Sequence, residues 1–213
     1  MWGNNMSLTS EQKIALRDNI SAQEELPIER IPAVIGGGSP ADTSPLYRVC
    51  KPVDLTPEGL TEARKIVDRM TSVLKRYREL TGTGRAFAAN QIGVERQVVV
   101  FLHPNGTMYH YINPMIGERS KDRNVYWEVY MSGAPLGVDV VRPASVRVTW
   151  HDLDGRDHDE ELSGFDARRM QHEIDHLHGR VCYNTEGTVY STLGYGLDSL
   201  AYMNQDLRPY EGV

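Results

Sequence analysis

Two histidines and a glutamate late in the chain have the spacing of a metal site. His172, Glu173 and His176 form the pattern His-Glu-x-x-His. On a helix, two imidazoles four residues apart project from one face and can reach the same ion. Two imidazoles suit a divalent transition metal such as zinc or iron(II), and the Glu173 carboxylate beside them can take a proton from metal-bound water. The pattern therefore predicts hydrolysis of a carbonyl compound.

The same spacing can arise by chance, because two histidines four residues apart also occur on wet helix surfaces. Here the intervening glutamate and the apolar residues around it favour a metal site over that alternative. We expect the neighbouring Asp175 and His178 to support the site or to lie on the surface, rather than to ligate the ion. The flanking apolar residues are Phe165, Met170, Ile174 and Leu177.

A helix late in the chain must carry this pattern. Residues 163–166 read Ser-Gly-Phe-Asp, which has the spacing of a capping box, and Gly179 suits the end of the helix. A clearer helix starts at Thr56, which is followed by the proline and glutamate typical of a first turn. Its apolar residues recur every three or four positions and predict one stripe against the core. The stripe comprises Leu60, Ala63, Ile66, Val67, Met70, Val73, Leu74, Tyr77 and Leu80.

The segments between these helices have the patterns of antiparallel strands. The first two segments flank His-Pro-Asn-Gly, which predicts a hairpin, and the Asp-Gly pair at residues 154–155 predicts a turn after the last one. The sequence therefore predicts an α+β fold, with helices packed against mostly antiparallel sheets. The expected strands are residues 97–102, 107–112, 125–131, 138–141 and 146–150.

The composition fits one soluble globular domain with an appendage. The 213 residues carry 23 Lys and Arg against 29 Asp and Glu, a net charge of −6 at pH 7, so no overall basic field favours nucleic acid or an anionic membrane. The longest apolar run, residues 98–102, is too short for a membrane span, and no charged-then-apolar leader is visible. Two distant cysteines make no disulfide framework, so we expect a cytoplasmic protein. The expected parts are an appendage at 1–25, a catalytic domain at 26–185 and a tail packed on the domain at 186–213.

Three segments, in this order and spacing, resemble the motifs of one family. Residues 84–93 look like Gly-x-Gly-Leu-Ala-Ala-x-Gln-Ile-Gly, with Ala86 for the second glycine and Phe87 for the leucine. Residues 128–132 stand where the family has Glu-Gly-Cys-Leu-Ser, and residues 171–177 match the third motif throughout. On these residues the chain resembles the peptide deformylases, which hydrolyse the N-formyl group from the starting methionine of new polypeptides.

The similarity to peptide deformylases extends from about residue 26 to residue 183. It implies their α+β fold, with antiparallel sheets around the motif helix and a peptide-binding cleft lined by a strand edge. It also implies that Glu173 activates water and then protonates the leaving amine, while the Gln91 side chain and the Met131 backbone amide stabilise the oxyanion. The residues expected to contact substrate are Gly84, Phe87, Ala88 and Ser132.

The third metal ligand is the main departure from the family. Family members use two histidines and the cysteine of the second motif, and Tyr130 stands at that cysteine position here. A neutral phenol, with a pKa of about 10, is a poor ligand unless the metal ionises it. Three outcomes stay open: Tyr130 ligates as a phenolate, it turns away and leaves His172 and His176 with waters, or the pocket holds no metal. Cys182 has the spacing of the last ligand of a longer zinc-protease motif, but the matching family position is apolar or aromatic.

The resemblance implies a metal-dependent hydrolase that acts on the formamide C–N bond of N-formylmethionyl peptides. Iron(II) or zinc is the expected metal, with nickel as a further candidate. Two alternatives stay open, namely an impaired paralogue that binds a formylated compound without turnover, and a hydrolase of another small formamide. The resemblance also makes the ribosome a candidate partner.

Overall fold

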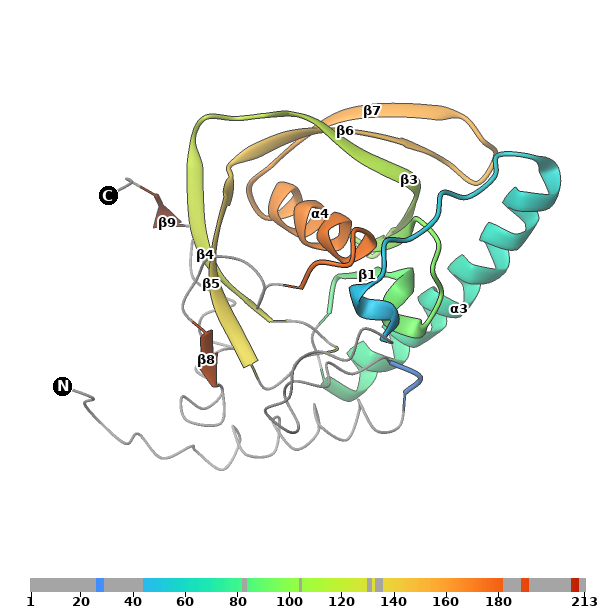
Figure 1. Ribbon diagram of the computed structural model, residues 1–213, viewed down its shortest axis with the longest axis horizontal. Coiled ribbons are helices and arrows are strands. Elements are labelled where there is room, and N and C mark those ends of the chain that lie inside the picture. Colours follow the sequence, from blue (N-terminus) through green and yellow to red (C-terminus); the bar gives the residue numbers. More distant parts are fainter. Residues whose placement is uncertain are drawn as a thin grey trace.

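The computed structural model describes residues 26–28, 44–81, 84–103, 105–129, 132, 136–181, 189–191 and 208–210. Within them the chain forms two antiparallel sheets and a central helix, which confirms the predicted α+β class (Figure 1). The predictions for Tyr130, Met131, Cys182 and the segment 1–25 fall outside these residues. No helix in the described part is long and apolar enough to cross a bilayer.

The first sheet has five strands in the order β1-β2-β3-β6-β7, each antiparallel to its neighbour. β2 and β3 form the hairpin predicted around residues 103–106. Gly155, with φ of 77°, lies in the predicted turn between β6 and β7. β1 lies at one edge of this sheet. The bounds are β1 (Ala86–Ala88), β2 (Val98–Leu102), β3 (Met108–Arg119), β6 (Ser145–His151) and β7 (Asp157–Ser163).

The second sheet has the strand order β8-β5-β4-β9 and is also antiparallel. β4 begins just after β3 ends, and β6 begins just after β5 ends, so the two strand pairs make one bent ribbon that runs from the first sheet into the second (Figure 1). Two short strands from late in the chain pair with the outer sides of this ribbon. The bounds are β4 (Arg123–Val129), β5 (Leu136–Pro143), β8 (Val189–Ser191) and β9 (Arg208–Pro209).

Two helices cover opposite faces of the first sheet. Along β2, Val98 and Val100 pack with α3, whereas Val99 and Phe101 pack with α4. Because both faces are covered, the strand reads as an uninterrupted apolar run. α4 also lies beside β4 and β5, so it occupies the angle between the two sheets (Figure 1). The bounds are α3 (Pro57–Thr81) and α4 (Gly164–Leu177).

The predicted starts of the two helices have different outcomes. Thr56 caps α3, because its hydroxyl accepts a hydrogen bond from the Gly59 N–H at 3.2 Å. Ser163 is the N-cap residue of α4, but its side chain makes no capping hydrogen bond, so the capping-box prediction is wrong. Instead Gly164, with φ of 58°, turns the chain from β7 into the helix, and its N–H donates to the Ala144 carbonyl at 3.1 Å.

The C-terminal end of α4 lies where the sequence predicted it. Gly179 follows the helix with φ of 68°, a left-handed conformation that favours glycine. A Cβ at this position would lie 2.6 Å from the Tyr47 carbonyl oxygen, so space also requires glycine. Nearby, the N–H of the buried Cys50 donates to the Leu177 carbonyl at 2.8 Å. The segment before α3 therefore contacts and stabilises the C-terminal end of α4.

Candidate active site

α4 brings the two histidines of the His-Glu-x-x-His pattern together. The imidazole rings of His172 and His176 lie edge to face, with their centroids 5.0 Å apart. His176 is fully buried, while 13% of the His172 side chain is exposed. Four residues make slightly more than one helical turn, which explains this proximity. The helical placement predicted for the pair is confirmed.

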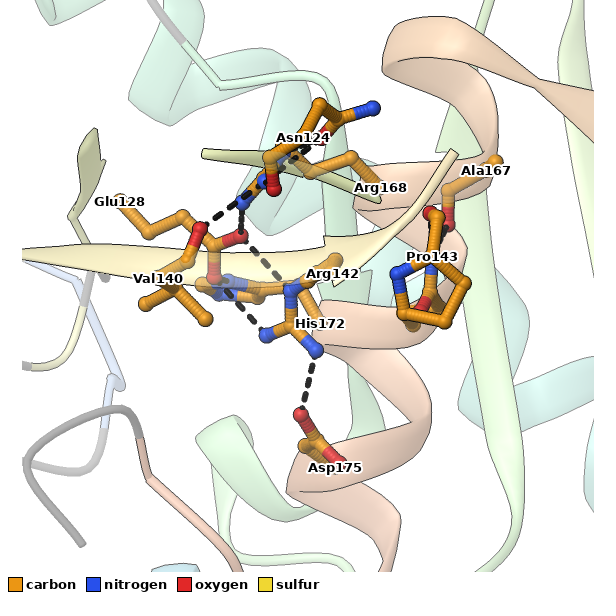
Figure 2. A network of polar contacts seen from close by, with 10 residues as sticks. Asn124, Glu128, Val140, Arg142, Pro143, Ala167, Arg168, His172 and Asp175 are labelled. Atoms are coloured by element: carbon orange, nitrogen blue, oxygen red, sulfur yellow. Dashed lines mark hydrogen bonds and ion pairs between the residues drawn. The ribbon is translucent and has the colours of Figure 1, made fainter. Parts of the chain in front are cut away.

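A buried carboxylate orients His172. Oε2 of Glu128, on β4, lies 2.9 Å from Nδ1 of His172 (Figure 2). Burial alone would raise the pKa of Glu128, but the charge and hydrogen bonds of Arg142 and the contact with His172 hold that pKa well below its usual value. An ionised carboxylate can only accept, so Nδ1 of His172 carries the hydrogen. Nε2 is then the nitrogen whose lone pair can ligate a metal.

Two arginines neutralise Glu128. Arg142, on β5, donates Nε and Nη2 to the carboxylate at 2.7 and 2.8 Å, and its Nη1 bonds to Asp175 at 2.7 Å (Figure 2). Arg168 reaches the same carboxylate from α4, one helical turn before His172. Burial opposes the charge of Arg142, yet Glu128 and Asp175 raise its pKa above the ordinary value. These residues form a closed ionic network behind the histidine.

Arg168 also ties α4 to the second sheet. Its Nη2 donates to the backbone oxygens of Asn124 and Val140 at 2.8 and 2.9 Å, and to the Asn124 side chain at 2.7 Å. The sequence reasoning missed this role, although one signal was available. Arg168 stands four residues before His172, a spacing that puts both side chains on one side of a helix.

Glu173 is placed for acid–base chemistry. The residue is 5% exposed, and its Oε2 has no hydrogen-bond partner within the described residues. Burial raises the pKa of Glu173 to about 7, against a smaller opposing influence of His172. A carboxyl group with a pKa near neutrality can both accept and return a proton at physiological pH.

The glycine-rich loop places Gln91 beside α4. This loop includes η2 (Ala89–Ile92), directly after β1. Oε1 of Gln91 accepts the Ala88 N–H at 2.9 Å, which leaves the amide Nε2 directed to Oγ of Ser132, at 3.4 Å. The neighbouring Asn90 donates its side-chain amide to the His176 carbonyl at 2.6 Å. Three of the predicted residues, Gln91, Ala88 and Ser132, therefore lie together.

Phe87 and Gly84 lie on the other side of β1. Phe87 is fully buried in the cluster that packs with α3, because alternate residues of a strand point to opposite faces. Its side chain therefore does not line the α4 side, contrary to the expectation that it contacts substrate there. Gly84 has φ of 90°, and a Cβ on it would lie 3.0 Å from Cδ1 of Tyr77 on α3. Gly84 thus serves the backbone shape of the loop.

The described donors fit one side of a metal site. Within the described ranges, no group of three or more His, Cys, Asp or Glu could hold an ion. Two imidazoles are present, and His172 is oriented by a carboxylate as metal-ligating histidines are. The buried Glu173 oxygen lies on the same helix. The expected third ligand, Tyr130, belongs to the residues that the structure does not describe.

Comparison with known proteins gives a consistent result. The family model for polypeptide deformylase matches residues 39–187. A peptide deformylase of Prochlorococcus marinus (strain NATL2A) is 32% identical over 162 residues, 71% of this chain and 78% of that protein. One from Novosphingobium aromaticivorans is 44% identical over 69 residues, 32% of this chain and 37% of that protein. The crystal structure of the Thermotoga maritima peptide deformylase has a TM-score of 0.60 at 26% identity, covering 74% of this chain and 94% of that one.

Proposed function

The chain belongs to the polypeptide deformylase family, and on this basis we propose that it is a metallohydrolase that removes N-formyl groups from formylmethionyl peptides. The observation that carries the proposal is the buried Glu173 carboxyl, which lies on one helix with two adjacent imidazoles. In the overall reaction water adds to the formyl carbon and the C–N bond breaks. The products are formate and a peptide with a free amine.

His172 and His176 would hold the divalent metal, with Tyr130 as the proposed third ligand. When bound, the metal supplies a Lewis acid that makes water more acidic. Glu173 would accept a proton from the attacking water and return it to the leaving amine, roles that suit a buried carboxyl group whose pKa burial raises. Glu128 keeps His172 in the tautomer that can ligate.

Gln91 is proposed to stabilise the negative charge on the formyl oxygen. The hydrogen bond from Ala88 fixes the Gln91 amide so that its N–H group, rather than its oxygen, is available to that charge. The Met131 backbone amide is the proposed second donor. One such donor typically contributes about 10²- to 10³-fold in rate. We propose that Ala88 and Ser132 contact the peptide through the loop and the edge of β1, and that Gly84 acts through the backbone shape of the loop.

The remaining assignments are also proposals. Iron(II) or zinc is the proposed metal, nickel a further candidate, and the cytoplasm the proposed location, with the ribosome as a candidate partner. The proposed catalytic domain is 26–185, preceded by an appendage at 1–25. Pairing of β8 with β5 and of β9 with β4 supports a tail, 186–213, that packs on this domain.

The test is an assay of formyl-Met-Ala-Ser hydrolysis by the full chain, loaded anaerobically with iron(II), zinc or nickel. We expect release of formate, and we expect Glu173→Gln to lower kcat by roughly 10²- to 10⁴-fold. Glu161→Gln, at an exposed position on β7, is the matched control and keeps the activity. No hydrolysis with any of the three metals, where another family member is active, would contradict the proposal.

A further inference from the structure

One buried asparagine joins the loop of Gln91 to the end of α4. Asn90 directly precedes Gln91 in η2 and is fully buried. Its side-chain Nδ2 donates to the His176 carbonyl at 2.6 Å. This hydrogen bond therefore connects the main chain of a proposed metal ligand to the residue next to the proposed oxyanion donor.

The end of α4 does not need this bond for its own hydrogen bonding. The last four carbonyls of a helix have no partner inside it and must find one elsewhere. Here the backbone N–H groups of residues 50, 178, 179 and 180 already donate to the carbonyls of residues 174–177. The His176 carbonyl itself accepts the Gly179 N–H at 2.9 Å, so Asn90 adds a second hydrogen bond to it. Capping of the helix therefore does not explain Asn90.

The other polar atom of the Asn90 side chain is unfavourable for the fold. Oδ1 is buried and has no hydrogen-bond partner within the described residues. A buried acceptor without a partner is destabilising, whereas an apolar side chain of similar volume, such as leucine, carries no such cost. Buried polar groups that reduce stability in this way are typical of functional sites.

The amide of Gln91 depends on where its loop lies relative to α4. Oε1 of Gln91 accepts the Ala88 N–H, and Nε2 lies 3.4 Å from Oγ of Ser132. These contacts orient the amide but do not join it to the helix of the histidines. The bond from Asn90 to His176 makes that connection, one residue away from Gln91. A displacement of about 1 Å at a reacting group can lower a rate by about 10²-fold.

We infer that Asn90 is a positioning residue, which sets the place of the Gln91 amide relative to the metal-binding side of α4. This inference rests on the proposed function. Asn90 acts through Gln91 and through the main chain of His176, and the charge that Gln91 is proposed to stabilise develops only during the reaction. The loss of Asn90 should therefore lower kcat and leave KM nearly unchanged.

The direct test is the state of the Gln91 side chain in Asn90→Leu. This change removes the donor and the unpartnered acceptor together and keeps a similar volume. In nuclear magnetic resonance spectra of the isotope-labelled full chain, we expect the Gln91 side-chain amide signal to shift and its hydrogens to exchange about tenfold faster. Tm should stay equal or rise. Gln91→Ala identifies the signal by its loss. An unchanged signal and exchange rate in Asn90→Leu would overturn the inference.

A second variant and a matched control complete this test. Asn90→Ala introduces no larger group and should change the Gln91 signal in the same way, so the test does not depend on how leucine packs. Gln97→Leu removes a similar bond outside η2, because Nε2 of Gln97 donates to the Cys50 carbonyl at 3.2 Å. It should leave the Gln91 signal unchanged. Equal shifts in Asn90→Leu and Gln97→Leu would refute the specific role of Asn90.

Kinetics with formyl-Met-Ala-Ser distinguish positioning from a merely structural role. Asn90→Leu should lower kcat by about 10- to 100-fold and change KM by less than about threefold. In the Gln91→Ala background the same change should cause little further loss, because both substitutions remove one contribution. An equal loss of kcat in both backgrounds would refute an action through Gln91.

This inference and the proposed function fail in different ways. If the wild type hydrolyses the formyl peptide and Asn90→Leu alters neither kcat nor the Gln91 signal, the positioning role is refuted and the deformylase stands. If Asn90→Leu alters the Gln91 signal and the wild type hydrolyses no formyl peptide with any metal, the positioning of Gln91 stands and the hydrolase is refuted.

Discussion

A single carboxylate sets the chemical state of the proposed site. Glu128 contacts the histidine in front of it and two arginines behind it, and all of these side chains are largely buried (Figure 2). Because the arginine charges hold Glu128 ionised, His172 is kept in one tautomer. The network therefore has two tasks, the stability of the fold and the orientation of a ligand.

Glu128→Gln tests the contribution of the network to stability. An amide leaves Arg142 and Arg168 with less negative charge in a buried setting, so we expect the free energy of unfolding to fall by roughly 3–5 kcal/mol. Urea unfolding followed by circular dichroism measures this change. Glu118→Gln, an exposed glutamate on β3, should change it by less than about 0.5 kcal/mol. Equal stability of the two variants would mean that the network contributes little.

Sequence reasoning could find the residues that form a local pattern. His172, Glu173 and His176 span about one helical turn, so their spacing in the sequence predicts that their side chains lie close together. Glu128 contacts Arg142 and Arg168, which lie 14 and 40 positions away in the sequence, and no local pattern predicts such contacts. The orientation of Phe87 was missed for another reason, since β1 has only three residues and shows no readable alternation.

At the scale of elements, α4 depends on how its two ends are joined to the rest of the chain. The capping box expected at its start is absent, because burial and the β7 connection position that end instead. Its other end was predictable, since glycine after an apolar periodic segment is a strong stop signal. The contact that makes this glycine necessary, with the Tyr47 carbonyl, is long-range and could not be predicted.

Gly179→Ala should therefore be destabilising for two reasons. Left-handed φ costs a residue with a Cβ about 1–2 kcal/mol, and the contact with Tyr47 adds to that cost. Gly106→Ala is the matched control, because φ there is 87° and nothing lies within 4 Å of the added Cβ. Thermal unfolding of both variants separates the cost of the left-handed φ from the cost of the contact with Tyr47. If both melt at the same temperature, the Tyr47 contact has no energetic weight.

The turn between β6 and β7 should make stability depend on acid pH. Burial raises the pKa of Asp152, but the hydrogen bonds from His158 and from the N–H groups of Arg156 and Asp154 together outweigh it and lower the pKa to about 2. A lowered carboxyl pKa adds stability above the unfolded value, and that stability disappears as pH falls from about 4 through about 2. Asp152→Asn should lower Tm by roughly 2–4 °C at pH 6.

The comparison at low pH completes this prediction. At pH 2 the difference in Tm between wild type and Asp152→Asn should be much smaller than at pH 6, because about half of the wild-type carboxyl groups are then protonated in the native state. A difference in Tm that stays constant from pH 6 to pH 2 would show that charge is not the cause.

At the scale of the whole molecule, metal binding should be visible as thermal stability. The proposed ligands come from α4 and from the segment after β4, so an ion would join the central helix to the second sheet. Zinc at about 100-fold above its Kd should add about 2.7 kcal/mol, or roughly 5–10 °C in Tm. Tyr130→Cys should give a larger rise at the same zinc concentration, because a thiolate binds zinc more firmly than a phenol.

Differential scanning calorimetry of chelator-treated protein, with and without zinc, provides the measurement. His176→Ala is the control in which zinc should give no rise. If wild type and this variant respond equally, zinc binds elsewhere.

The α+β class itself was predictable, because one-sided helices and short extended segments indicate it. The composition of the second sheet was not, because that sheet includes β8 and β9 from distant parts of the chain.

The division of α4 into three sides has an evolutionary consequence. Residues 172 and 176 are the proposed metal ligands, residues 168 and 175 belong to the ionic network, and residues 167, 170 and 174 pack in the core. A substitution on one of these sides can therefore change the ligands, the charges or the packing without acting directly on the other two. One helix of fourteen residues thus joins the proposed metal ligands, the ionic network and the core of the first sheet.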